Sequence, residues 1–226
     1  KSVFFDLKML GKVSIVAVPS ILQQSFISIG NMFIQSLVNG YGPSVIAGYS
    51  AAIKLNTFAI TSFTTLANGL SSFAAQNIGA GKYDRVKKGY KSALFMAIVV
   101  VTPFFLLYFI GSTFMMGIFV DAEEGKGAIL AGVKFLTIVT PFYYMVVLKL
   151  MSDGVLRGAG AMGCFMVTTF TDLILRVILA YVFSVPMGMG EAGIWKSWPY
   201  GWSISAILSI IFYLSGKWKP KENNFK

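Results

Sequence analysis

Residues 13–38, VSIVAVPSILQQSFISIGNMFIQSLV, decide the fold, because this stretch contains no Asp, Glu, Lys or Arg. A transmembrane helix requires about 20 predominantly apolar residues. Comparable stretches recur along the 226-residue chain, which is 56% hydrophobic and 12% charged, with a mean hydropathy of +0.71. An ordinary soluble domain carries about 25% charged residues. The sequence therefore predicts an all-α, polytopic membrane protein whose main solvent is lipid.

The apolar stretches predict six transmembrane helices and two flanking segments. Residues 1–12 mix apolar and charged side chains, as expected of a lead-in that lies at the membrane interface. Residues 217–226 form a basic tail. The six spans are predicted at residues 13–38, 44–70, 91–119, 128–150, 161–184 and 201–216.

The net charge of +10 is distributed unevenly between the two sides of the predicted bundle. One side holds most Lys and Arg residues, including those of the loop at 82–91 and, by the predicted boundaries, Lys149 and Arg157. The other side holds only Lys126 and Lys196. The positive-inside rule then places both termini in the cytoplasm, with the chain in the plasma (cell inner) membrane. The surplus charge indicates topology rather than binding of nucleic acid.

An aromatic group precedes the last predicted span, on the side with few basic residues. It comprises Trp195, Trp198, Tyr200 and Trp202. Trp and Tyr are enriched where a membrane meets water. We therefore expect these residues to lie at the membrane interface.

Polar side chains recur at intervals of three and four within several spans, which places them on single helix faces. They either form hydrogen bonds between helices or line a water-filled cavity, because a polar side chain that faces the hydrocarbon of the bilayer is costly. Whole stripes that include Gln, Asn and Lys favour the cavity. The candidate cavity residues are Gln24, Asn31 and Gln35 in the first span, Lys54, Thr57, Thr61 and Asn68 in the second, and Tyr144 in the fourth.

Two carboxylates lie at or inside the predicted membrane region, each with a basic residue four positions later. Asp153 precedes Arg157, and Asp172 precedes Arg176. Each couple shares a helix face and can form a neutralising ion pair. The alternative is coupling to H⁺ or Na⁺, for which Asp172 is the stronger candidate, because Asp153 is expected near the cytoplasmic end.

Enzymatic chemistry has no support in the sequence. The chain contains no His, and Cys164 is its only cysteine, so metal clusters and disulfides within it are excluded. The glycines at 79–82 and 158–163 lack the spacing of nucleotide-binding loops and are typical of tight turns and close packing. We expect no cofactor, no metal and no catalytic residue.

Four motifs make the chain resemble the C-terminal lobe of the multidrug and toxic compound extrusion (MATE) family. They are QNIGAGKYDRVKKG at 76–89, GVLRGAGAMG at 154–163, PSILQQ at 19–24 with QSLVNGYG at 35–42, and GIW at 193–195. The resemblance implies one six-helix lobe of a twelve-helix transporter, with an N-terminal lobe as its partner and Lys1 in the cytoplasmic connector. It also implies export of small organic cations or amphiphiles by alternating access, in exchange for Na⁺ or H⁺.

The chain departs from the family pattern at two positions. Some members carry an acid in the helix that corresponds to the first span, where this chain has Gln23 and Gln24, and another acid earlier in the fourth span than Asp153. We therefore hypothesise that the coupling site lies in the other half of the protein. Two alternatives remain open: a flippase for lipid-linked precursors or polysaccharides, which would use Lys54, Lys134 and Arg176, and a membrane scaffold without transport activity.

Overall fold

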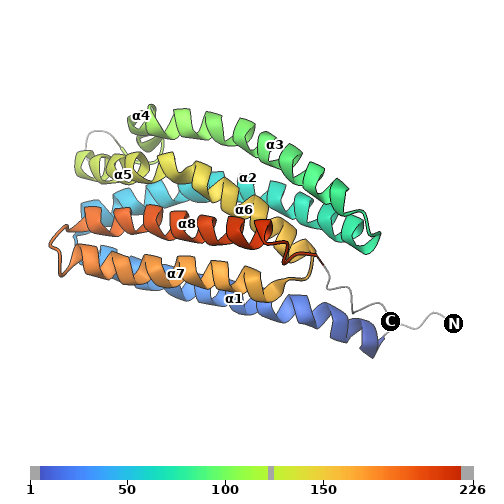
Figure 1. The fold of residues 1–226 in the computed structure, drawn as a ribbon. Helices are drawn as coiled ribbons and strands as arrows, with labels where there is room; N and C mark the ends of the chain where they lie inside the picture. Colours follow the sequence, from blue (N-terminus) through green and yellow to red (C-terminus); the bar gives the residue numbers. More distant parts are fainter. Residues whose placement is uncertain (1–5, 122–124, 220–226) are drawn as a thin grey trace.

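The computed structural model describes residues 6–121 and 125–219, and regular secondary structure within these ranges is helical without a strand. The long helices run side by side in one bundle, with α1 next to α7 at one edge and α3 at the other (Figure 1). The predicted all-α fold is confirmed. The helices are α1 (Leu7–Asn39), α2 (Pro43–Gly79), α3 (Tyr83–Phe109), α4 (Ser112–Gly117), α5 (Lys126–Val139), α6 (Tyr143–Gly158), α7 (Met162–Ser184) and α8 (Glu191–Leu214).

The fourth predicted span is a broken helix. α5 has 14 residues and is about 21 Å long at the usual helical rise, too short to cross a bilayer core of about 30 Å. A 3₁₀ turn at Thr140–Phe142, which contains Pro141, joins α5 to α6. Proline removes one backbone donor, so a break at this position follows from its chemistry. Pro19 and Pro103, by contrast, lie inside the continuous helices α1 and α3.

Three helical stretches in the described ranges are long and apolar enough to cross a membrane by length and composition alone. They are Tyr83–Phe109, Lys126–Gly158 and Met162–Ser184. Helices α1, α2 and α8 have 33, 37 and 24 residues, which is sufficient length. Polar residues lower the hydropathy of α1 and α2, and these are the helices that carry the predicted polar stripes. The count of six crossings stays a prediction for α1, α2 and α8.

Several helices extend beyond the predicted spans. α1 begins at Leu7, so residues 7–12 continue the helix instead of forming a separate lead-in, while residues 1–5 lie outside the described part. α8 begins at Glu191, ten residues before the predicted start at 201. α6 continues to Gly158, which moves Arg157 from a predicted connection into a helix and places Lys149 in the middle of a helix rather than at its end. Of the predicted tail, residues 217–219 follow α8, and residues 220–226 lie outside the described part.

The predicted aromatic interface group is mostly a buried core, which corrects its assignment. Trp195, Trp198 and Trp202 are 0%, 4% and 5% exposed, whereas Tyr200 is 53% exposed. The indole of Trp195 stacks on Tyr49 at 5.1 Å between ring centroids. The three tryptophans are separated by three and four residues, so they share one face of α8, and that face packs against neighbouring helices. The helical spacing of these three residues therefore predicts their location better than the general preference of Trp for the membrane interface.

Two glycines let α6 approach α2 closely. A Cβ atom at Gly154 would lie 2.8 Å from the carbonyl oxygen of Ala67, and one at Gly158 would overlap the carbonyl oxygen of Ser71. Gly160, in the turn after α6, has φ +71, a conformation that glycine adopts at little cost. The predicted role of the 158–163 glycines in packing and turning is confirmed at Gly158 and Gly160. This contact fixes α6, which carries the buried charged site.

Candidate functional site

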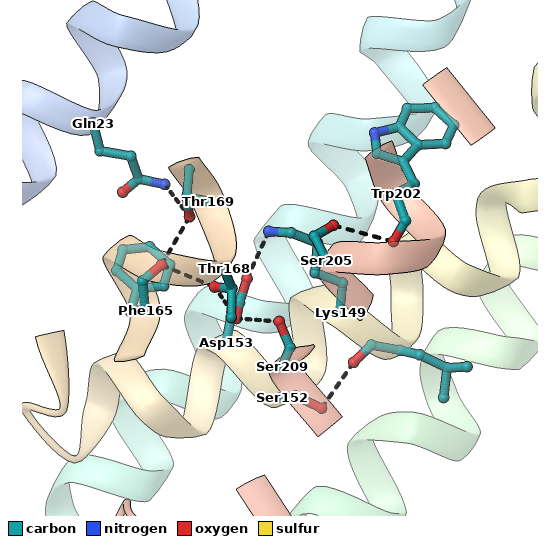
Figure 2. A network of polar contacts seen from close by, with 11 residues as sticks. Gln23, Lys149, Ser152, Asp153, Phe165, Thr168, Thr169, Trp202, Ser205 and Ser209 are labelled. Carbon is teal, nitrogen blue, oxygen red and sulfur yellow. Dashed lines mark hydrogen bonds and ion pairs between the residues drawn. The ribbon is translucent and has the colours of Figure 1, made fainter. Parts of the chain in front are cut away.

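The buried carboxylate of Asp153 joins three helices in the interior of the bundle (Figure 2). Asp153 lies on α6 and is 3% exposed. Its Oδ2 atom accepts a hydrogen bond from Lys149 Nζ at 2.7 Å. Its Oδ1 atom lies 3.0 Å from Thr168 Oγ1 on α7 and 2.7 Å from Ser209 Oγ on α8. One ammonium group and two hydroxyl groups therefore surround this carboxylate.

Asp153 pairs with Lys149 and not with the predicted partner Arg157. Positions four residues before and after Asp153 lie on the same side of α6, so spacing alone does not choose between them. Lys149 is 7% exposed and lies beside the carboxylate. Arg157, in the last turn of α6, turns toward α2, where its Nη2 donates to Asn68 and its Nε to Ser71 Oγ at 3.4 Å. Depth in the bundle decides which cation reaches the carboxylate.

The second predicted ion pair, Asp172 with Arg176, is absent from the described residues. Arg176 is 6% exposed, and its guanidinium lies over the Trp198 ring at 4.4 Å from the centroid. A desolvated cation–π contact of this kind contributes about 2 kcal/mol. Arg176 Nε and Asp172 Oδ1 are buried without a hydrogen-bond partner. The ring, rather than the carboxylate four residues earlier, orients this arginine.

Further polar contacts connect the remaining helices to this centre. Gln23 Nε2 on α1 donates to Thr169 Oγ1 on α7 at 3.1 Å (Figure 2). Tyr143 OH donates to Asn56 Oδ1 on α2 at 3.0 Å. Tyr90 OH on α3 lies 3.1 Å from Ser152 Oγ. Helix α6 therefore has polar contacts with α2, α3, α7 and α8, and the site is held by the whole bundle.

The outer face of α2 is mostly polar, although Phe58 on this helix is 65% exposed, and it contrasts with the outer face of α3. Lys54, Thr57, Thr61 and Asn68 are all exposed in this chain. Beyond Ser92, the exposed residues of α3 are apolar side chains such as Phe95, which is 69% exposed. Hydrocarbon accepts the α3 face and penalises the α2 face. The α2 face must therefore meet water or another protein surface.

The hydroxyl groups along the polar stripes of α1 and α2 form hydrogen bonds within their own helix. Ser28 donates to Gln24 O at 3.0 Å on α1, and Thr65 donates to Thr61 O at 2.9 Å on α2. Gln35 donates to Asn39 Oδ1, also on α1, at 2.9 Å. Such bonds satisfy the side chain without joining two helices. Within the described chain, the stripes thus do little of the interhelical bonding that a scaffold would require.

The structure brings the predicted cavity residues together only in part. Gln24 and Asn31 are exposed on α1, which packs mainly on α7. Asn68 is on the exposed face of α2, but its amide oxygen is occupied by Arg157. Tyr144 OH lies 3.3 Å from Thr102 Oγ1, so this residue faces α3 rather than the α1 and α2 stripes.

Sequence reasoning missed Lys149 as a site residue, and it missed Thr168, Ser209 and Gln23 as partners. Lys149 was counted with the charges of the cytoplasmic side because it lies in the last turn of the predicted fourth span, 128–150. Its spacing of four residues before Asp153 was the available signal. Nothing in the local sequence around Ser209 indicates that it meets a carboxylate 56 residues earlier.

The chain is similar to multidrug transporters in sequence and in structure. The MatE family model matches residues 19–182. The "Probable multidrug resistance protein YpnP" of Bacillus subtilis (strain 168) is 25% identical over 206 residues, which cover 90% of this chain and 45% of that protein. The chain thus spans about half the length of the curated relatives it matches.

Solved structures share this fold over about half of their length. A transporter of the MOP superfamily from Pyrococcus furiosus, described as having a binding pocket of reversed polarity, superposes with a TM-score of 0.88 at 18% identity, covering 96% of this chain and 49% of that one. A multidrug resistance MATE family transporter in an outward-facing conformation superposes with a TM-score of 0.86 at 18% identity, covering 96% and 48%. The described bundle therefore has the fold of one lobe of such proteins. Because the MatE model matches well over half of the residues, this chain belongs to the MatE family of integral membrane transporters.

Proposed function

We propose that the protein containing this chain exports small organic cations or amphiphilic compounds across the plasma membrane by antiport with Na⁺ or H⁺. The observation that carries the proposal is the exposed polar face of α2, with Lys54, Thr57 and Thr61, on a chain of the MatE family. Such a face needs water or protein opposite it. A second lobe facing it across an aqueous cavity, with substrate bound between the lobes, meets this need.

The proposed mechanism is alternating access by rocking of the two lobes. The interior contacts of α6 support it, because they join α2, α3, α7 and α8 into a unit that can move as one body. The outward-facing relative provides a precedent for one of the two end states. Both termini of this chain are proposed to be cytoplasmic, because the basic segment at 82–91, which includes the first turns of α3, lies at the same end of the bundle as the C-terminus of α8 (Figure 1).

The flippase alternative draws on the Pyrococcus relative, whose pocket polarity is described as reversed. An anionic substrate would need cations in the cavity. Of the three predicted cations, Lys134 pairs with Glu191 at 3.3 Å, and Arg176 is buried with its guanidinium over the Trp198 ring. Lys54 is exposed on the α2 face. One available cation favours export of cationic or neutral compounds over a pyrophosphate-bearing lipid.

Thiol labelling tests whether the stripes face water. In a Cys164→Ser background, Gln24→Cys, Asn31→Cys and Thr61→Cys should react with a charged thiol reagent at least about tenfold faster than Phe95→Cys. All four positions are exposed in this chain, but Gln24, Asn31 and Thr61 belong to the polar stripes of α1 and α2, whereas Phe95 lies on the part of α3 whose exposed side chains are apolar. The measurement is the labelling rate of the intact protein in proteoliposomes, with reagent added from each side. Uniform protection of all four positions would support the scaffold alternative.

Drug transport tests the role of the α1 amides. Gln24→Ala and Asn31→Ala should each raise the apparent KM for at least one exported compound by about two- to tenfold, because each removes a hydrogen bond worth about 0.5–1.5 kcal/mol. Initial efflux rates in proteoliposomes provide the measurement, and Thr113→Ala on α4, also exposed, is the control. Unchanged efflux of several compounds by both variants would remove these residues from the cavity.

A further inference from the structure

The oxygen atoms around Asp153 have the composition of a cation site. Two carboxylate oxygens of Asp153 and the hydroxyl oxygens of Thr168 and Ser209 lie within one hydrogen-bonded cluster, with separations of 3.0 Å and 2.7 Å from Oδ1. Carboxylate and hydroxyl oxygens are ligands that hard cations accept. The three residues come from α6, α7 and α8, so the cluster is built by tertiary packing and is buried.

A positive charge from the protein itself already lies beside this cluster, on the Oδ2 side of the carboxylate. Lys149 Nζ lies 2.7 Å from Asp153 Oδ2, and the side chains of Lys149 and Asp153 are only 9% and 4% exposed. Two other charged groups act on this lysine: Asp172 attracts the ammonium, and Arg176 repels it. The four side chains contribute two positive and two negative charges. A charge-balanced interior requires no additional ion.

We propose that the Lys149 ammonium is a built-in cation that supplies the counter-charge at a monovalent-cation site formed by Asp153, Thr168 and Ser209. The ammonium supplies the charge that a bound Na⁺ would supply, so this half of the protein binds no free Na⁺ at Asp153. If export is driven by sodium, the ion binds elsewhere in the protein. The inference concerns ion binding alone, and it stands or falls independently of drug export.

The test removes the lysine and leaves the oxygen ligands in place. Lys149→Met deletes the ammonium while retaining an apolar chain of similar length, which leaves one carboxylate without its counter-charge. We expect the purified intact protein to gain about one bound Na⁺ per molecule, measured as ²²Na⁺ binding at constant ionic strength with N-methylglucamine as the replacement cation. The gain should disappear in Lys149→Met/Asp153→Asn.

Two controls separate this site from any other sodium site. Asp153→Asn in the otherwise unchanged protein should leave Na⁺ binding as it was, because Lys149 already supplies the counter-charge of this carboxylate. Lys134→Met removes a lysine that also pairs with a carboxylate, Glu191 at 3.3 Å, but the Lys134 side chain is 48% exposed. This variant should gain no Na⁺, because water screens the released carboxylate.

Either of two results overturns the proposal. One is a loss of Na⁺ binding in a folded, monodisperse Asp153→Asn variant, which would show that a free ion shares the site with Lys149. The other is a folded, monodisperse Lys149→Met variant without Asp153-dependent Na⁺ binding. If Lys149→Met does not yield folded protein, Lys149→Gln is measured in its place, and the Asp153→Asn comparison still decides the first result.

Discussion

Asp153→Asn is expected to lower the free energy of unfolding by about 3–5 kcal/mol, because it leaves the Lys149 ammonium buried without a counter-charge. Lys149 and Asp153 are 7% and 3% exposed, so water cannot replace the lost partner. The asparagine keeps the size of the side chain and can still accept hydrogen bonds from Thr168 and Ser209, which isolates the effect of charge. Steric trapping or unfolding in detergent mixtures would provide the measurement.

The matched control for Asp153→Asn is the double variant Lys149→Met/Asp153→Asn. Replacing both members of a buried ion pair by neutral groups is often close to neutral in stability, so most of the loss should be recovered. The difference between the two variants measures the cost of an unpaired charge rather than of a changed shape. A single variant that loses less than about 1 kcal/mol, or a double variant no more stable than the single one, would contradict a desolvated pair.

Gly158→Val is expected to destabilise the protein by about 3 kcal/mol through overpacking between α6 and α2. A Cβ at residue 158 would overlap the carbonyl oxygen of Ser71, lie 3.0 Å from the carbonyl carbon of that residue and 3.1 Å from Ala74 Cβ. The first two atoms belong to the backbone of α2, which cannot move away by a rotamer change. Because α6 carries Asp153 and Arg157, the same displacement should disturb the contacts of both residues. The midpoint of thermal unfolding in detergent would report the loss.

Gly163→Ala is the control for Gly158→Val, since it lies in the same glycine-rich segment. A Cβ at residue 163 would meet no atom within 4 Å, and the residue lies inside α7. Alanine is favoured over glycine in helices by about 1 kcal/mol, so this variant should be neutral or slightly stabilising. Equal losses for both variants would show that the segment is sensitive to any added side chain, and that the α6–α2 contact is not the cause.

The helices could be predicted from the sequence because their signals are local. Hydropathy placed long helices over residues 13–38, 44–70 and 161–184, and each of these ranges overlaps a single observed helix. The ends were less well predicted. α8 begins at Glu191, whereas its start was predicted near 201. The prediction was late because Trp195 and Trp198 were assigned to the membrane interface by residue type, although both are buried. Their burial depends on α2 and α5, which no local window contains.

The candidate site could be predicted only in its components. Residue type and spacing were enough to identify Asp153, Asp172 and the polar stripes on the first two spans as candidates. In the structure, Asp153 is buried and most residues of the stripes are exposed. The partners of the charged groups were predicted wrongly. Arg157 bonds to Asn68 instead of Asp153, and Arg176 lies over Trp198 instead of pairing with Asp172. Spacing of four residues makes a pair geometrically accessible, but a competing partner on another helix can be closer.

The sequence by itself determined that this protein is helical, that it belongs in a membrane and that two of its helices carry polar faces, because each of these properties is a sum over neighbouring residues. Only the tertiary structure decided that Lys149, rather than Arg157, neutralises Asp153, and that Thr168 and Ser209 complete the cluster. The physical reason is that an ion pair depends on depth and on the rotation of each helix about its axis. Both are set by packing among α6, α7 and α8.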